Sequence, residues 1–279
     1  MLGLGLGMGV CVPTIAAEPS AAATPRVITL APSLARLVCA AGACHDLVAV
    51  AQFTDAPPQA AKLPRIGGFS GINDEAILAA HPSLVLALDQ FTPLAWVTRL
   101  QRLGLTVRVL HVHSLDDVAT ALRQIGDWLG TRAAAEGAAA DYLKQLDALR
   151  QRYAHTRPVR VFFQLGVAPA YTVNRESAVS AAIAVCGGVN VFGKLPRIAE
   201  PVSAEAVLAR QPQAVFYSAD SNRAEIMAYW KRLSDVPAVT HHAIFPVAVE
   251  KLTGTPQVLD GIRTICRDLD ALRGRRNHG

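Results

Sequence analysis

A short helical motif occurs twice in the chain, and this internal repeat restricts the fold more than any other feature of the sequence. The first copy, SGINDEAILAAHPSLVLA, begins at residue 70, and the second, PVSAEAVLARQPQAVFY, begins at residue 201. Each copy predicts a capping residue (Asn73 or Ser203), a helix of two turns, a proline stop and a buried strand. One long offset indicates two related lobes, because a solenoid would need at least three short-period units.

The order of the predicted elements supports two α/β lobes. Strands such as RVITLAP and SLVLAL alternate with short helices over residues 25–114, and the same alternation resumes over residues 158–273. Residues 115–157 read as helical throughout, and residues 131–155 could form one helix about 35 Å long. We therefore expect two Rossmann-like α/β lobes joined by one long rigid helix, with a ligand cleft between them.

The N-terminal segment has the pattern of an export signal. MLGLGLGMGVCVPTIAA is apolar, and EPSAAATP follows it with small residues and prolines. Its glycines and Pro13 disfavour a spanning helix, so we interpret residues 1–24 as a signal peptide and linker. Cys11 offers lipidation as an alternative, although Val10 is bulky for that processing. No later stretch reaches 18 apolar residues without a charge or a proline, so we expect no membrane span in the mature chain.

Composition indicates a folded domain without a dominant charged surface. The chain of 279 residues is 51% hydrophobic and carries a net charge of +5. Most basic residues are mixed with acids, which argues against a nucleic-acid-binding protein. Arg273, Arg275 and Arg276 cluster at the end, and we expect a solvated, frayed tail there, with residues 274–279 outside the lobe. A contact of this cluster with anionic lipid or nucleic acid is the alternative.

The sequence contains no motif that predicts catalysis, so we expect a binding protein and not an enzyme. His111 and His113 lie on one face of a predicted strand, where they could ligate a metal ion. No acidic residue lies beside them in the sequence, and we expect ordinary packing or surface histidines and no metal site. A metal-binding function would require either histidine to face the cleft with carboxylates beside it.

The repeated acids Glu75 and Glu205 indicate a partner surface. An acid in the first turn stabilises a helix by about 0.3 to 1 kcal/mol, which by itself could account for either residue. Its occurrence in both copies instead favours two carboxylates on one rim of the cleft. Such a pair suits two arginines of a partner built with twofold symmetry.

The cysteines do not define their own pairing. Removal of the signal would leave Cys39, Cys44, Cys186 and Cys266. Four cysteines in an exported chain allow three pairings, and none of them has the spacing of a metal site.

Several segments together resemble a known family. They are RVITLAPS, FTDAPPQA, GGFSGINDEAI, HPSLVLA, VRVFFQLG, ESAVSAAIAVCGGVNVFG and VSAEAVLARQPQAV. Over residues 26–272 the chain resembles the cluster A (class III) periplasmic binding proteins of ABC importers, whose members carry cobalamin, haem or iron siderophores. The cobalamin-binding members are the most similar.

The resemblance implies a location, partners and a disulfide. It implies a monomer in the periplasm, without a cofactor, that delivers its ligand to a permease dimer in the inner membrane. Glu75 and Glu205 match the two glutamates that dock on permease arginines in this family. Cys186 and Cys266 match the family's disulfide, which leaves Cys39 and Cys44 for a local pair.

The resemblance also implies the residues of the ligand cleft. The matching positions are Ser33, Phe53, Phe69, Leu88, Leu165, Tyr171 and Ala199. Three of them keep aromatic rings, whereas Leu88, Leu165 and Ala199 stand where cobalamin-binding members have aromatics. A large, mostly neutral ligand is therefore expected, with a corrinoid as the first choice and haem or a ferric siderophore as alternatives. An enzyme using this cleft is a further alternative, and it would need a nucleophile and base near Phe69 and Tyr171.

Overall fold

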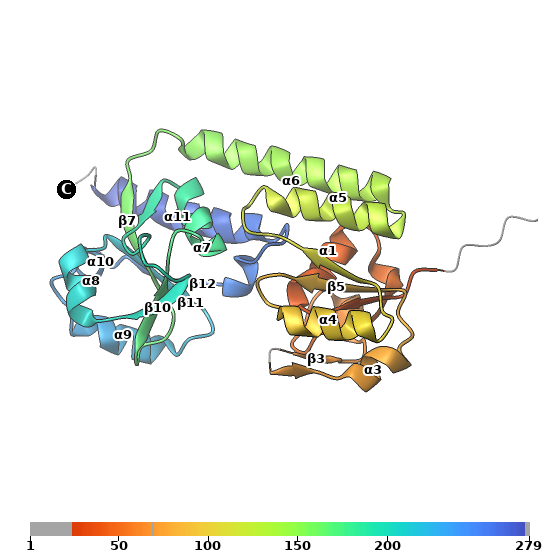
Figure 1. The fold of residues 1–279 in the computed structure, drawn as a ribbon. Coiled ribbons are helices and arrows are strands. Elements are labelled where there is room, and N and C mark those ends of the chain that lie inside the picture. The colour runs from red at the N-terminus through yellow and green to blue at the C-terminus, as the bar shows by residue number, and fades with distance from the viewer. Residues whose placement is uncertain (1–23, 69, 277–279) are drawn as a thin grey trace, which may run out of the picture.

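The computed structural model describes residues 24–68 and 70–276, and its two α/β lobes are bridged by one long helix (Figure 1). This arrangement confirms the predicted fold class. The interpretation of residues 1–24 as a signal peptide and linker falls almost wholly outside the described residues. Among the helices that the structure describes, none is both long and apolar enough to cross a membrane.

The N-terminal lobe contains a parallel sheet of four strands in the order β2-β1-β5-β6. The strands are β1 (Val27–Thr29), β2 (Leu47–Val50), β5 (Leu84–Leu88) and β6 (Val107–Leu110). The connecting segments contain α1 (Pro32–Ala40), α2 (Pro58–Ala61), the hairpin of β3 (Gly67–Gly68) and β4 (Gly71–Ile72), α3 (Asp74–Ala79) and α4 (Leu94–Arg102), with a 3-10 turn at Cys44–Asp46. Strand β5 is buried along its whole length, as its continuous apolar sequence predicts for a central parallel strand.

The C-terminal lobe contains a second parallel sheet in the order β12-β11-β7-β9. Its strands are β7 (Val159–Gln164), β9 (Gly188–Asn190), β11 (Ala214–Ser218) and β12 (Ile244–Val247). A small antiparallel pair, β8 (Ala170–Val173) and β10 (Ala199–Val202), lies beside it. The helices are α7 (Ala178–Val185), α8 (Ala204–Arg210), α9 (Arg223–Lys231), α10 (Pro237–Thr240) and α11 (Val258–Arg276), with a 3-10 turn at Val249–Lys251.

The two sheets have the same connectivity, which confirms the relation inferred from the repeat. In each lobe the first strand (β1 or β7) pairs with both the second strand (β2 or β9) and the third (β5 or β11), and the third also pairs with the last (β6 or β12). Strand β5 begins at Leu84 and β11 begins at Ala214, which are 130 positions apart. The sequence repeat therefore marks the same helix and central strand of each lobe.

Local geometry is also the same in the two copies. Asn73 Oδ1 accepts a hydrogen bond from the Ala76 N–H (3.0 Å), and Ser203 Oγ accepts one from the Ala206 N–H (3.2 Å), so both predicted caps are confirmed. Each helix is followed by a residue with positive φ, His81 (42°) or Gln211 (43°), just before the proline. This left-handed residue turns the chain into the following strand.

The long helix that bridges the lobes is the second helix of a helical hairpin. Helix α5 (Asp117–Leu129) ends at Gly130, whose φ of 73° lets the chain reverse into α6 (Arg132–Tyr153). The long helix predicted over residues 131–155 is α6, which runs across both lobes in Figure 1. Its Tyr142 hydroxyl donates to the Leu115 carbonyl (2.8 Å), and its Tyr153 hydroxyl donates to Asp270 of α11 (2.9 Å).

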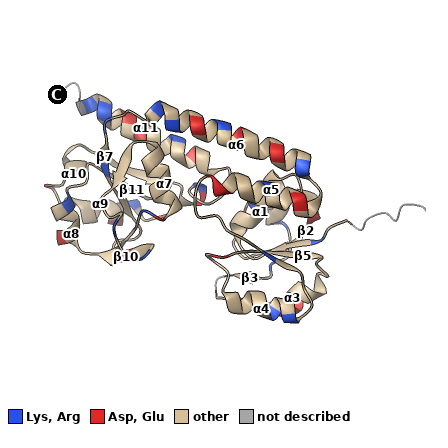
Figure 2. Ribbon diagram, turned by 45° about the horizontal axis from the view of Figure 1, so that its top comes forward, with Lys and Arg blue, Asp and Glu red and all other residues tan. Residues whose placement is uncertain are grey.

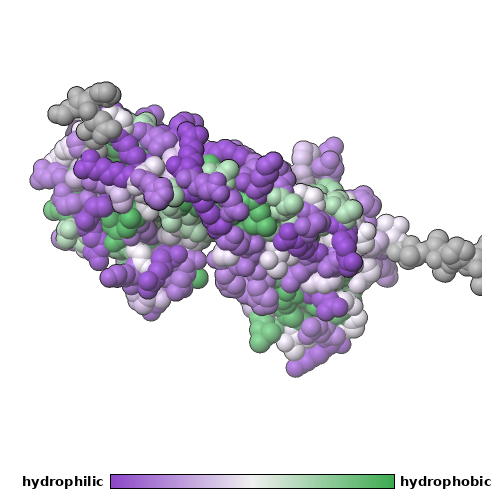
Figure 3. Space-filling model, turned by 90° about the horizontal axis from the view of Figure 1, so that it is seen from above, coloured by the Kyte–Doolittle hydropathy of each residue, from purple (hydrophilic) through white to green (hydrophobic). Residues whose placement is uncertain are grey.

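A single stripe of α6 packs inward. Its buried residues are Ala135, Ala139, Tyr142, Leu146 and Tyr153. They belong to one hydrophobic cluster that also contains residues of α1, α5, α7, α11 and both parallel sheets. The surface seen from above, on the side of α6, is mostly hydrophilic (Figure 3). The bridge is thus an amphipathic helix whose apolar stripe is part of a core shared by the two lobes.

The expected frayed C-terminal tail is wrong for residues 274–276, because α11 continues to Arg276. Arg273 is anchored and not solvated: its guanidinium donates to the carbonyls of Arg157 (3.0 Å) and Cys186 (2.7 Å) and pairs with Asp270 (2.9 Å). One of these carbonyls lies in the segment between α6 and β7, and the other lies at the end of α7. Acidic and basic residues remain interspersed along α6 and α11 (Figure 2).

Each lobe contains one disulfide bond. Cys186, at the end of α7, is bonded to Cys266 of α11, which is the pairing that the resemblance implied. Cys39 and Cys44 form the local pair, across the turn after α1. The partners are 80 residues apart in the first bond and 5 in the second, so the first restricts the unfolded chain far more.

We expect the double substitution Cys186→Ala, Cys266→Ala to lower the free energy of unfolding by about 2 to 5 kcal/mol. Cys39→Ala with Cys44→Ala is the matched control, and its loss should be about 2 kcal/mol smaller because the closed loop is short. Urea unfolding without reductant measures both. Equal losses in the two variants would contradict the loop-entropy explanation.

The contact between α5 and α6 gives a second prediction. A Cβ on Gly126 would lie 2.3 Å from the Ala135 Cβ, whereas a Cβ on the exposed Gly137 would meet no atom within 4 Å. Gly126→Ala should therefore destabilise the protein by about 1 to 3 kcal/mol through overpacking. Gly137→Ala should stabilise it by up to about 1 kcal/mol through helix propensity. Thermal unfolding checks the two signs, and stabilisation by Gly126→Ala would show that the hairpin is not closely packed.

Candidate ligand-binding cleft

A cavity of about 700 Å³ lies between the two lobes. The N-terminal lobe contributes residues that follow the carboxyl ends of its strands: Ser33, Leu88, Gln90, Phe91, Val112, His113, Ser114 and Leu115. The carboxyl edge of a parallel sheet is where α/β proteins commonly bind ligands, because loops and helix N-termini meet there. The volume is within the usual range for ligand sites.

The C-terminal lobe forms the opposite wall with Glu176, Ser177, Ala178, Val179, Ile198, Leu252, Thr253 and Gly254. The buried Asn174 positions the start of α7, because its carbonyl accepts hydrogen bonds from the hydroxyls of Ser177 (3.0 Å) and Ser180 (2.7 Å). Gly254 lies against the N-terminal lobe, where an added Cβ would be 2.5 Å from Val112 Cγ1. A glycine at this position allows the two lobes to touch at the cavity.

The cavity wall is mainly apolar with a few polar groups. The apolar residues are Leu88, Phe91, Val112, Leu115, Ala178, Val179, Ile198 and Leu252, and the polar ones are Ser33, Gln90, His113, Ser114, Glu176, Ser177 and Thr253. Glu176 is its only acidic side chain among the described residues. Such a wall suits a large, mostly uncharged ligand that accepts and donates a few hydrogen bonds.

The structure brings two of the predicted ligand-binding residues, Ser33 and Leu88, to this cavity. Phe53, Leu165, Tyr171 and Ala199 are not among its lining residues. Phe53 is 70% exposed in the turn after β2. Leu165 and Tyr171 exchange two backbone hydrogen bonds (2.8 and 2.9 Å), and Ala199 begins β10 next to the lining residue Ile198. Phe69 lies outside the described residues.

Most residues of the cavity wall were not predicted from the sequence. Phe91, the one phenylalanine, tyrosine or tryptophan among the described lining residues, follows the strand SLVLAL by a few positions. A signal was available, since residues just after apolar parallel strands lie at the ligand-binding edge. Glu176 and Ser177 lacked such a signal, because they precede a helix.

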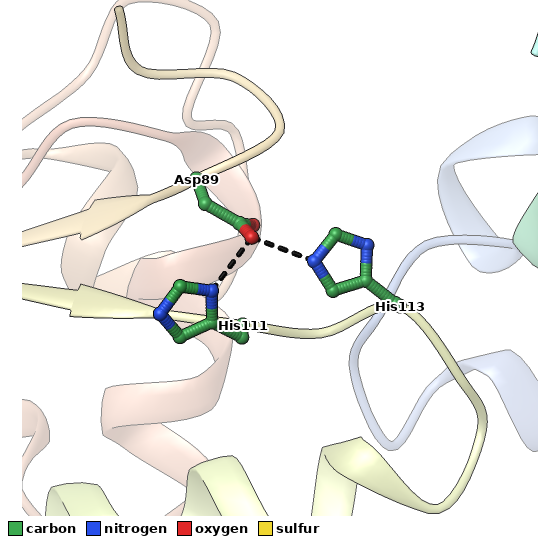
Figure 4. Close-up of side chains that lie close together, drawn as sticks. All are labelled: Asp89, His111 and His113. Carbon is green, nitrogen blue, oxygen red and sulfur yellow. Dashed lines mark hydrogen bonds and ion pairs between the residues drawn. The ribbon is translucent and has the colours of Figure 1, made fainter. Parts of the chain in front are cut away.

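A cluster of Asp89, His111 and His113 lies at the edge of this cavity (Figure 4). His111 Nδ1 and His113 Nε2 both donate to Asp89 Oδ2, at 2.7 and 2.6 Å. The other carboxylate oxygen, Oδ1, accepts from the Gln90 N–H (2.8 Å). Burial acts to raise the pKa of Asp89, but the hydrogen bonds from the two imidazoles outweigh it, and the pKa lies below its ordinary value.

An acidic residue that the sequence does not place beside these histidines contacts both of them in the structure. Asp89 is 22 positions before His111 in the sequence, and the pairing of β5 with β6 brings the two together. His113 also lines the cavity. The two features that a metal-binding reading of the sequence required, a carboxylate and the cleft, are therefore both present.

Glu75 and Glu205 lie on separate lobes, in the first turns of α3 and α8, and both are exposed. Hydrogen bonds from its own N–H and from the Ser203 hydroxyl lower the pKa of Glu205. Leu78 and Leu208, three residues further along each helix, have nearly the same exposed fractions, 39% and 38%. Each lobe thus presents an acid and a leucine on one helix face. In Figure 2 α3 and α8 lie on different lobes, away from α6.

Two equivalent lobes, a shared bridging helix and a cavity between the lobes define a two-lobed ligand-binding protein. The family model for periplasmic binding proteins matches residues 27–247, and the chain belongs to this family. It is 36% identical over 221 residues to the vitamin B12-binding protein of Pectobacterium atrosepticum, which covers 77% of this chain and 79% of that protein. Its identity to the vitamin B12-binding protein of Vibrio cholerae is 31% over 256 residues, or 91% of each chain.

Solved structures have the same fold. The periplasmic vitamin B12-binding protein BtuF of Vibrio cholerae superimposes with a TM-score of 0.82 at 31% identity, over 89% of this chain and 98% of that one. The periplasmic heme-binding protein RhuT from Roseiflexus gives a TM-score of 0.79 at 23% identity, over 89% of this chain and 99% of that one. At that lower identity the likeness concerns the fold alone.

Proposed function

We propose that this protein captures cobalamin or a related corrinoid in the cavity between its lobes and delivers it to an ABC importer in the inner membrane. One observation carries the proposal: a ligand-sized cavity lies between the two lobes of a chain that is 36% and 31% identical, over most of its length, to two vitamin B12-binding proteins. The wall has the apolar surface and scattered hydrogen-bonding groups that a bulky, largely neutral macrocycle requires.

Delivery requires a surface that the permease recognises, and we assign it to the faces of α3 and α8. Glu75 and Glu205 are exposed carboxylates at equivalent positions of two like lobes, and Leu78 and Leu208 add an apolar contact beside each acid. A permease dimer offering two arginines could bind both acids at once. Bidentate arginine–carboxylate pairs would set the orientation of the protein on the membrane.

Haem is the second candidate ligand. The imidazole of His113 lies on the cavity wall, and histidine is a common axial ligand of haem iron. Solved structures of heme-binding proteins share the fold. Titration with haemin, followed by its Soret band, distinguishes this candidate from a corrinoid binder that leaves haemin free.

Residues 1–24 would direct the chain to the periplasm, where a monomer would carry the ligand from its source to the permease. Binding and release without chemical change are all that this role requires, so we assign the cavity no catalytic step. Membership of the periplasmic binding protein family supports a binding role.

We expect Phe91→Ala to weaken cyanocobalamin binding by about 1 to 3 kcal/mol, because a ring on the cavity wall would be lost. Phe53→Ala is the matched control, since Phe53 is also exposed but does not line the cavity. Isothermal titration calorimetry measures both affinities. An unchanged affinity for Phe91→Ala, with a loss for Phe53→Ala, would move the binding site to the rings inferred from the resemblance.

We expect Glu75→Ala combined with Glu205→Ala to abolish corrinoid uptake by cells while the affinity for the ligand stays within about twofold, because the docking faces and the cavity are separate. Glu225→Ala removes another exposed acid from the first turn of a helix and should leave uptake intact. Transport of labelled cobalamin and calorimetry provide the two measurements. Loss of ligand binding in the double variant would contradict the docking role.

A further inference from the structure

We propose that Asp89, His111 and His113 form a binding site for one divalent transition-metal ion of the Zn²⁺ class at the edge of the cavity. The three side chains offer a carboxylate oxygen and two imidazole nitrogens, all within 4.8 Å of one another. In Figure 4 both rings point toward the carboxylate. The inference needs no corrinoid and is independent of the proposed function.

Strand pairing brings these ligands together. Leu88 and Leu110 are the last paired residues of the neighbouring parallel strands β5 and β6. The Asp89 N–H then donates to the Leu110 carbonyl (3.2 Å), which fixes Asp89 beside His111. His113 lies two residues beyond His111, so both imidazoles can reach the same side. Backbone hydrogen bonds, and not only the side chains, therefore hold the cluster at the sheet edge.

The distances suit a metal centre after small adjustments. Zn²⁺ binds imidazole nitrogen and carboxylate oxygen at about 2.0 to 2.2 Å, so two ligands of a tetrahedral ion are about 3.4 Å apart. The present separations from Asp89 Oδ2 are 2.7 Å to His111 and 2.6 Å to His113. The three side chains are 26%, 68% and 58% exposed, in the order Asp89, His111 and His113. Rotations of such exposed side chains can open the cluster by under an ångström.

The donor set selects the kind of ion. Two imidazoles with one carboxylate suit Zn²⁺, Co²⁺ or Ni²⁺, whereas Mg²⁺ and Ca²⁺ prefer oxygen ligands alone. Three protein ligands leave a fourth position for water or for a group of a bound molecule. His113 extends from the cluster to the cavity wall, so a ligand in the cavity would lie close to this position.

A neighbouring amide can orient one of the ligands. The Gln90 side chain is 3.2 Å from His113 Nδ1, the ring nitrogen that faces away from Asp89. The Gln90 side-chain amide N–H donates to the Val112 carbonyl (2.6 Å). A metal ion on His113 Nε2 would leave the ring proton on Nδ1, and the amide oxygen, turned toward the ring in place of that bond, would accept a hydrogen bond from the Nδ1–H. The contacts of Asp89 with His111 and His113 are not explained by protein stability alone, because ion pairs between exposed side chains contribute little to the free energy of folding.

The test measures metal binding by the full chain, produced without a histidine tag and stripped with chelator. Titration with ZnCl₂ should give one site per chain by calorimetry, and MgCl₂ should give none. Asp89→Asn and His111→Ala should each weaken Zn²⁺ binding at least tenfold. His241→Ala removes an exposed histidine elsewhere and should change nothing.

A second readout separates binding from misfolding. Zn²⁺ should raise the melting temperature of the wild-type chain and of His241→Ala, but not that of the two cluster variants, whose melting temperatures without metal show that they fold. Zn²⁺ binding that persists in both cluster variants would overturn the proposal. So would equal affinity for Mg²⁺, or a loss in His241→Ala as large as in His111→Ala.

Discussion

The apolar stripe of α6 is the interaction on which the rest of the structure depends. Ala135, Ala139, Tyr142 and Leu146 enter a hydrophobic cluster that reaches the sheets of both lobes, so neither lobe can turn away without exposing part of that core. Hydrogen bonds from Tyr142, in the middle of this stripe, to Leu115 and from Tyr153, at its end, to Asp270 also fix α6 to its neighbours. The lobes are therefore held together through a common hydrophobic cluster that includes α6.

Because both lobes have the same connectivity, equivalent elements appear on both sides of the cavity. The carboxyl edge of the N-terminal sheet supplies one wall, and the start of α7 with the segments before β10 and after β12 supplies the other, whereas the equivalent helices α3 and α8 supply the exposed acids. Two related lobes thus form one cavity, whose two walls differ in sequence, and two similar outer helix faces. This separation suits a carrier, which must hold a ligand at one place and be recognised at another.

Only part of the candidate site could be predicted from the sequence. Ser33 and Leu88 were inferred from the resemblance, and both line the cavity near the ends of strands β1 and β5. Phe91 and Val112 follow two paired strands of the N-terminal lobe, and only the packing of the lobes brings Thr253 to the same cavity. Resemblance to cobalamin-binding proteins also pointed to rings such as Phe53, which lies outside the cavity wall. Loop conformation differs among relatives more readily than the sheets do.

Short-range patterns in the sequence determined the repeated caps at Asn73 and Ser203, the alternation of strands and helices, and the long helix α6. These features depend on neighbours within a few residues, through capping hydrogen bonds and apolar periodicity. Tertiary structure alone decided that Asp89 meets His111 and His113, because that contact arises from the register of two parallel strands joined by a long crossover. Tertiary structure also decided that the guanidinium of Arg273, in α11, donates hydrogen bonds to the carbonyls of Arg157 and Cys186, which are distant in the sequence. A side chain's distant partners are set by how elements pack, which no local pattern encodes.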